Sequence, residues 1–102
     1  MKSNNIQTTG NIIRQLREGR QLPLRKIAAL LEIDTSYYSK IERSERKATK
    51  EQIHLLEHFF EVEKNFLMIP YLSEKIYYEI SEEDCAGQVL KVAEARVRYN
   101  KK

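Results

Sequence analysis

A cluster of basic side chains marks the middle of the sequence. Between residues 38 and 50 there are five basic and two acidic residues. Their fields add over a Debye length of about 8 Å, so the cluster attracts an anionic partner more strongly than the net charge of the chain does. A solvated helix end has the same composition, and charge alone does not choose between the two interpretations. The basic residues are Lys40, Arg43, Arg46, Lys47 and Lys50, and the acidic ones are Glu42 and Glu45.

A second spacing, His54-Leu-Leu-Glu57-His58, matches the H-x-x-E-H pattern of some zinc peptidases. Two histidines four apart on a helix can share a metal, and a glutamate on that face can act as a base. The match is short, and we see no further carboxylate placed as a third ligand. Cys85 has no nearby histidine to activate its thiol, and the three glycines stand apart, so there is no phosphate-binding loop. We therefore expect no enzymatic activity, no metal and no cofactor.

The composition is that of one globular domain with a small appendage. Of the 102 residues, 41% are hydrophobic and 32% are charged, and the net charge is +3. This excess lies in residues 1–62, which hold 11 basic and 8 acidic residues, whereas residues 63–102 hold 7 of each. The single cysteine excludes an internal disulfide. There is neither a signal peptide nor an apolar run of about 20 residues, so we expect a cytoplasmic protein without a membrane partner.

Helical periodicity fills the sequence, and the alternation typical of strands is absent. The sequence therefore predicts an all-α fold. Thr8 or Thr9 can cap the first helix, Asp34 the third, and Thr49 with Gln52 forms a capping box before the fourth. The expected helices run from residue 9 to about 19, from 23 to 31, from 35 to about 43, from 50 to 60, from about 64 to 80 and from 81 to about 99.

Two later signals shape the fifth and sixth helices. Pro70 lies inside the fifth apolar segment and must kink it or split it. Ser81-Glu-Glu-Asp84 has the composition of a helix start, because acidic side chains are favoured by the N-terminal end of the helix dipole. At the second helix, Pro23 suits the first turn, where its missing N–H would be unpaired anyway.

The second and third helices are about two turns each and are joined by a turn around Glu32–Asp34, as in a helix-turn-helix. Ala28 and Ala29 are small where two backbones must come close, and Ile33 can fill the corner. The third helix offers an outward face of polar and aromatic groups, which fits the major groove of B-DNA, about 12 Å wide. That face consists of Thr35, Ser36, Tyr37, Lys40 and Arg43.

Residues 9–67 resemble the lambda-repressor/Cro-type helix-turn-helix domains, also called the xenobiotic-response-element family of bacterial regulators. The matching residues are Leu16-Arg17, Ile27-Ala28, Leu31 and Ser39-Lys-Ile-Glu42-Arg43. The resemblance implies a five-helix DNA-binding domain over residues 1–66, followed by a helical extension over residues 67–102. The sequence departs from the family pattern at Leu24 (often Gln), at Glu32 and Ser44 (often Gly) and at Ala48 (often Pro).

The resemblance also implies residue roles. It pairs Arg17 with Glu42, tying the first helix to the third beneath the DNA surface. Tyr37 has an alternative role as a surface aromatic at the edge of the core, and Lys40 has one as a solvated side chain. The implied base contacts are Thr35, Ser36, Tyr37 and Lys40. The implied phosphate contacts are Arg25, Arg43, Arg46 and Lys47.

Residues 66–99 carry more apolar surface than one small core requires. Helices that pack against their copy would bury it, and a two-fold dimer would set two recognition helices about 34 Å apart on a palindromic site. Alternatively, these helices fold back and enlarge the core of the monomer. The predicted dimer interface consists of Leu72, Ile76, Val89, Val92, Ala93 and Val97.

The sequence thus predicts a transcriptional regulator that binds operator DNA as a homodimer, by occupying a promoter or by contacting RNA polymerase. Three narrower roles fit this reading: a general repressor, an antitoxin-like autoregulator and a controller protein of a restriction–modification operon. The alternative from another class is a helix-turn-helix protein-interaction module, antitoxin-like or scaffold, with no specific DNA role.

Overall fold

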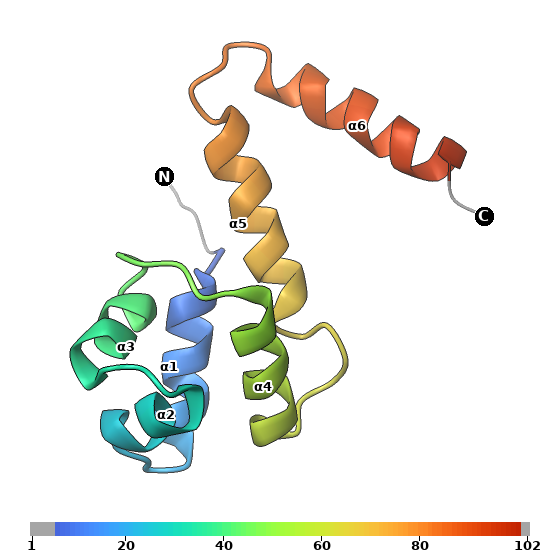
Figure 1. Cartoon of the computed structure of the whole chain (residues 1–102). Helices are drawn as coiled ribbons and strands as arrows, with labels where there is room; N and C mark the ends of the chain where they lie inside the picture. The colour runs from blue at the N-terminus through green and yellow to red at the C-terminus, as the bar shows by residue number, and fades with distance from the viewer. Residues whose placement is uncertain (1–5, 101–102) are drawn as a thin grey trace. The chain divides into compact units, whose positions relative to one another are not determined.

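The computed structural model describes residues 6–100, which form six helices and no strand. This confirms the predicted all-α class. The helices are α1 (Thr9–Gly19), α2 (Leu24–Leu31), α3 (Thr35–Glu42), α4 (Lys50–Phe60), α5 (Met68–Ile80) and α6 (Ala86–Asn100) (Figure 1). The chain forms two compact units, Met1–Leu72 and Ser73–Lys102.

Helices α1 and α4 begin at capping residues that the sequence predicts. The hydroxyl of Thr8 accepts a hydrogen bond from the amide of Asn11 at 3.1 Å. The hydroxyl of Thr49 accepts from the amide of Gln52 at 3.1 Å, and the side chain of Gln52 accepts from the amide of Thr49 at 2.9 Å, which completes the capping box. Each bond pairs an amide that its helix leaves unsatisfied, and such a cap contributes about 1 kcal/mol.

The starts of α2 and α3 differ in detail from the prediction. Pro23 occupies the N-cap position, one residue before the first turn of α2. Asp34 occupies the N-cap position of α3, but its side chain makes no capping hydrogen bond. Helix α3 ends at Glu42 with Arg43 as its C-cap, in agreement with the expected end at about Arg43.

Several helices end in the left-handed backbone region although no glycine is present there. Glu32 ends α2 with φ 59°, and Ser44 follows α3 with φ 65°. These are two of the positions where the resembled family often has glycine. A side chain in this conformation costs about 1–2 kcal/mol, which the surrounding packing must offset. The described non-glycine residues of this kind are Gln21, Glu32, Ser44, Glu61 and Asn65.

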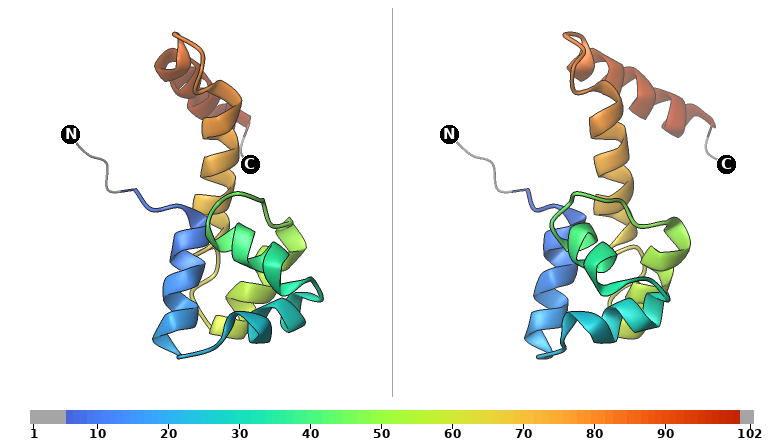
Figure 2. Two further views of the ribbon diagram at one scale, coloured as in Figure 1. Left: turned by 90° about the vertical axis from the view of Figure 1, so that its left-hand side faces the viewer. Right: turned by 60° about the vertical axis from the view of Figure 1, so that its left-hand side comes forward.

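The core of the first unit draws on α1 to α4 and on the start of α5 (Figure 2). Leu67 is fully buried, and Met68 and Tyr71 are each 6% exposed. The compact unit therefore extends to Leu72, whereas the boundary predicted from the sequence lies between residues 66 and 67. The buried apolar residues are Ile13, Ile27, Ala28, Leu31, Tyr38, Ile41, Ala48, Ile53, Leu56, Phe60, Leu67, Met68 and Tyr71.

Helices α1 and α3 come together at Gly10. A Cβ atom added at this glycine would lie 2.3 Å from the carbonyl oxygen of Ile41 and 2.6 Å from that of Glu42. Both neighbours are backbone atoms of α3, which cannot rotate away. The missing side chain of Gly10 therefore lets α3 pack closely on α1.

The start of α5 is fixed by a side chain of α4. The amides of Leu67 and Met68 both donate to the Glu57 carboxylate, each at 2.9 Å. A carboxylate at a helix N-terminus pairs free amides and interacts favourably with the helix dipole. Because α5 begins at Met68, Pro70 lies in its first turn, where a missing N–H is tolerated. The helix predicted from about residue 64 therefore begins later, at Met68, and Pro70 does not split it.

The second unit contains the rest of α5 and α6. Helix α6 begins at Ala86, five residues after the predicted start, and Ser81–Asp84 form turns before it. None of the residues of α6 is buried. No helix in the described range 6–100 is long and apolar enough to cross a membrane.

Candidate nucleic-acid interface

Helices α2 and α3 form a helix-turn-helix. The turn is closed by the amide of Glu32 donating to the carbonyl of Ala29 at 3.1 Å, and by the amide of Ile33 donating to that of Ala28 at 3.0 Å. Ala28 is buried and Ile33 packs against the core, as expected. Ala29 is exposed, so only Ala28 is a small residue buried in this part of the core.

Helix α3 has one buried and one exposed face. Tyr38 and Ile41 anchor it in the core, at 0% and 3% exposure. The exposed side carries all four predicted base-contacting residues, and Tyr37 retains 39% exposure. These four are Thr35, Ser36, Tyr37 and Lys40.

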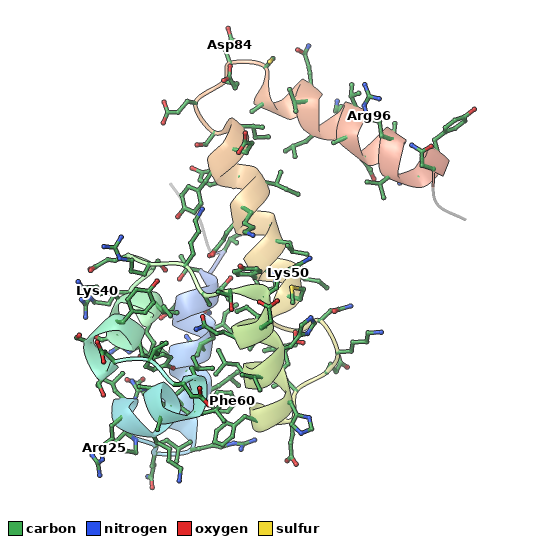
Figure 3. The ribbon with its side chains drawn as sticks, in the orientation of Figure 1. Arg25, Lys40, Lys50, Phe60, Asp84 and Arg96 are labelled. Carbon is green, nitrogen blue, oxygen red and sulfur yellow. The ribbon has the colours of Figure 1, made fainter. Side chains whose placement is uncertain are left out.

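The four predicted phosphate-contacting residues, Arg25, Arg43, Arg46 and Lys47, are also exposed. Figure 3 shows Arg25 of α2 and Lys40 of α3 along the same edge of the first unit. Arg46 and Lys47 follow on the loop after α3. That loop is held to the helix end because the amides of Glu45 and Arg46 both donate to the carbonyl of Lys40, at 2.8 and 3.3 Å.

Arg43 already has polar partners within the chain. Its guanidinium donates to both Glu45 carboxylate oxygens, at 3.0 and 3.2 Å, and to the Ser39 hydroxyl at 2.5 Å. The hydrogen bond with Glu45 raises the pKa of Arg43, and the same bond lowers the pKa of Glu45. A phosphate that reaches Arg43 must therefore compete with this exposed carboxylate.

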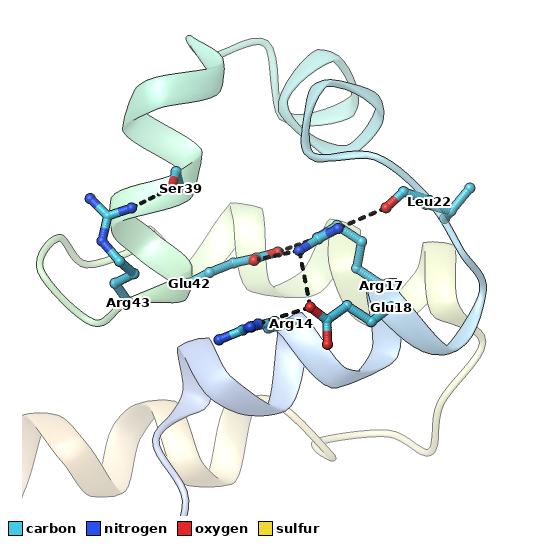
Figure 4. Close-up of polar contacts among 7 residues, drawn as sticks. All are labelled: Arg14, Arg17, Glu18, Leu22, Ser39, Glu42 and Arg43. Carbon is cyan, nitrogen blue, oxygen red and sulfur yellow. Dashed lines mark hydrogen bonds and ion pairs between the residues drawn. The ribbon is translucent and has the colours of Figure 1, made fainter.

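An ion pair beneath the surface joins α1 to α3 (Figure 4). The Nε of Arg17 donates to Glu42 Oε2 at 2.7 Å, and its Nη2 donates to Oε1 at 3.0 Å. The remaining Nη1 donates to the carbonyl of Leu22 at 2.8 Å. The Arg17 and Glu42 side chains are only 12% and 4% exposed. The hydrogen bond with Glu42 is the main cause of the raised pKa of Arg17.

The neighbouring Tyr38 ring is part of the same buried arrangement. Burial is the main cause that raises the pKa of its hydroxyl, and the nearby Glu42 carboxylate adds to the effect. The two hydrogen bonds between Arg17 and Glu42 join the C-terminal end of α3 to α1, and the Tyr38 ring is buried in the core. The exposed face of α3 is therefore presented from a fixed support.

The H-x-x-E-H residues do not form a metal site. Glu57 is buried and caps α5, while His54 is exposed, with its Nδ1 3.8 Å from the carboxylate of Glu57. Across the residues that the structure describes, no three His, Cys, Asp or Glu side chains are grouped to hold a metal.

Sequence reasoning missed four residues that support the candidate surface: Gly10, Arg20, Glu57 and Tyr71. Arg20 donates to the carbonyl of Phe60 at 2.7 Å and so caps the end of α4. The hydroxyl of Tyr71 donates to the carbonyl of Ala48 at 2.6 Å. All four act through contacts distant in sequence, for which periodicity and spacing give no signal.

Comparisons with known proteins place this geometry in a family. A family model described as helix-turn-helix, of the lambda-repressor/Cro type, matches residues 13–67, which is more than half of the chain. No curated protein and no solved structure gave a match.

Proposed function

The chain belongs to the lambda-repressor/Cro type of helix-turn-helix family of DNA-binding regulators, and from this premise we propose that it binds palindromic operator DNA as a homodimer and regulates transcription. The DNA-binding role follows from the family. The operator symmetry, the dimer and the residue roles are the parts that we add.

The observation that carries the proposal is the exposed face of α3. It presents two hydroxyls, a phenol and an ammonium group within six residues, between two sets of exposed guanidinium and ammonium groups. Hydroxyl and ammonium groups pair with base edges in the major groove, and flanking basic groups neutralise phosphates. No other face described here combines both kinds of group with a buried ion pair beneath it.

The salt dependence of DNA affinity tests the proposal. About 6–10 phosphate contacts should lower the affinity by about 10³- to 10⁵-fold between 50 and 200 mM salt. The measurement is fluorescence anisotropy with DNA that flanks the protein's own gene, located by footprinting. A chain without measurable DNA binding at low salt would be a protein-interaction module instead.

The residue roles predict two kinds of loss. Lys40→Ala should relax sequence preference, because a good base contact contributes about 1–3 kcal/mol of discrimination. Arg46→Ala should weaken binding to all sequences alike and reduce the salt slope by about one. The reverse pattern would mean that α3 enters the groove in another register.

We also propose that the dimer interface lies on the apolar surface of α5 and α6. Leu72, Ile76, Val89, Val92, Ala93 and Val97 are all exposed in the single chain. Exposed apolar side chains that recur along a helix are typical of association sites. Sedimentation at micromolar concentration should give a dimer, and a strict monomer would contradict this part of the proposal.

The regulatory role is also part of the proposal. We favour occupation of a promoter or contact with RNA polymerase in the cytoplasm, as a repressor or as a restriction–modification controller. A transcription assay with the footprinted promoter separates activation from repression. Co-transcription with a nuclease and a methyltransferase would support the controller role.

A further inference from the structure

The loop after the recognition helix is held at its far end by a residue outside the matched family region. Residues 46 and 47 lie between two anchors. The first is the carbonyl of Lys40, which accepts from the amides of Glu45 and Arg46. The second is Ala48, whose side chain is buried at 7% exposure and whose carbonyl accepts from the hydroxyl of Tyr71 at 2.6 Å. The family match ends at residue 67.

Tyr71 is itself fixed in place. It is 6% exposed and belongs to the first turn of α5, whose start is capped by the Glu57 carboxylate through the amides of Leu67 and Met68. The phenol thus connects the capped end of α5 to the loop. A buried, short hydrogen bond of this kind restricts the loop carbonyl to one orientation, because leaving either partner unpaired carries a desolvation cost.

We propose that Tyr71 is a positioning residue for phosphate binding: through the carbonyl of Ala48 it holds the loop so that Arg46 and Lys47 face the DNA backbone. This rests on the proposed function, because it requires that these two side chains contact phosphates. Ordering a loop before binding removes part of the entropy cost that binding would otherwise carry. Loss of the phenol hydroxyl therefore weakens DNA binding without changing which sequence is preferred.

The test is Tyr71→Phe in the full chain, with Tyr77→Phe as the matched control on the exposed side of the same helix. Tyr71→Phe should lower the affinity for operator and for unrelated DNA alike, by about three- to ten-fold. The ratio of the two affinities should stay the same, and Tyr77→Phe should bind as the unmodified chain does. Circular dichroism and thermal melting check that both variants are folded at the assay temperature.

A double-mutant cycle separates positioning from general destabilisation. In a chain that carries Arg46→Ala and Lys47→Ala, adding Tyr71→Phe should cause no further loss of affinity, because its effect passes through those side chains. The same further loss in both backgrounds would overturn the proposal. So would unchanged affinity in Tyr71→Phe, whereas an unmodified chain that binds no DNA would refute the proposed function itself.

A measurement on the unmodified chain covers the case in which Tyr71→Phe does not fold. When DNA is added, the carbonyl carbon of Ala48 and the hydroxyl-bearing ring carbon of Tyr71 should shift together in NMR spectra. Loop signals that shift while those of Tyr71 stay unchanged would overturn the proposal.

Discussion

Helices α4 and α6 use apolar side chains in opposite ways. In α4 the periodic residues Ile53, Leu56 and Phe60 are each at most 3% exposed. In α6 no residue is buried, and its large aliphatic side chains are between 38% and 65% exposed. Both helices show the period that predicts a contact surface. The difference teaches that helical periodicity identifies an apolar face. It does not tell whether other helices of the same chain bury that face.

The buried ion pair of the first unit and the exposed ion pair of α6 extend the contrast, and here the largest effect is expected. Glu42→Ala leaves the mostly buried Arg17 guanidinium without its forked partner, which should lower the free energy of unfolding by about 3–5 kcal/mol. Glu94→Ala removes the exposed pair with Arg98 in α6 and should cost about 0.5 kcal/mol or less. Urea denaturation measures both, and similar losses for the two variants would contradict the distinction.

Apolar truncation tests the comparison directly. Leu56→Ala should cost about 2–5 kcal/mol of unfolding free energy at any protein concentration, because it opens a cavity in the core. Val92→Ala should leave the unfolding of dilute protein unchanged and shift the self-association equilibrium toward monomer. Thermal melts at several concentrations, with sedimentation, distinguish the two. A loss at Val92 that is independent of concentration would show that α6 is covered by its own chain.

Two glycines offer a smaller, matched contrast. Gly10→Ala places a Cβ atom against backbone carbonyls of α3 and should cost about 1–3 kcal/mol. Gly87 has no atom within 4 Å of a built Cβ, so Gly87→Ala should raise stability by up to about 1 kcal/mol through helix propensity. Chemical denaturation measures the change in unfolding free energy of each variant and so shows whether it is a loss or a gain. A neutral Gly10→Ala would mean that α3 can move away from α1 at little cost.

The smallest expected effect concerns backbone strain. Every left-handed non-glycine residue in the described range lies in the first unit, whose core offsets the cost. Glu32→Gly should therefore add about 1 kcal/mol to the stability of that unit. Glu82→Gly, in the turn before α6, serves as the control and should not stabilise the chain. Differential scanning calorimetry compares them, and equal gains would remove strain as the explanation.

Local signals in the sequence were sufficient for much of the fold. The caps at Thr8 and Thr49 depend on residues three positions apart, and the sequence therefore predicts them correctly. The predicted start of α6 lies five residues too early, because the acidic Ser81–Asp84 segment suits a turn as well as a helix N-terminus. The predicted kink or split at Pro70 is wrong because the Glu57 carboxylate caps α5 at Met68, which places Pro70 in the first turn.

The candidate surface also has parts that the sequence predicts and parts that it does not. The exposed positions of Thr35, Ser36 and Lys40 follow from helical spacing once Tyr38 and Ile41 are taken as core. The hydrogen bonds from Arg20 to Phe60 and from Tyr71 to Ala48 depend on how distant segments meet. Pattern and spacing carry no information about such contacts, so the structure had to supply them.

The buried residues Leu67, Met68 and Tyr71 also have a consequence for modularity. The family match ends at Leu67, yet the side chains of all three lie in the core, and the amides of Leu67 and Met68 take part in the cap of α5. A chimaera that joins the first unit of this chain to a foreign effector domain should therefore be spliced after Leu72. A splice at residue 67 would keep the matched motif but omit Met68 and Tyr71, which are buried in the core of the first unit, and with them the hydrogen bond from Tyr71 to Ala48.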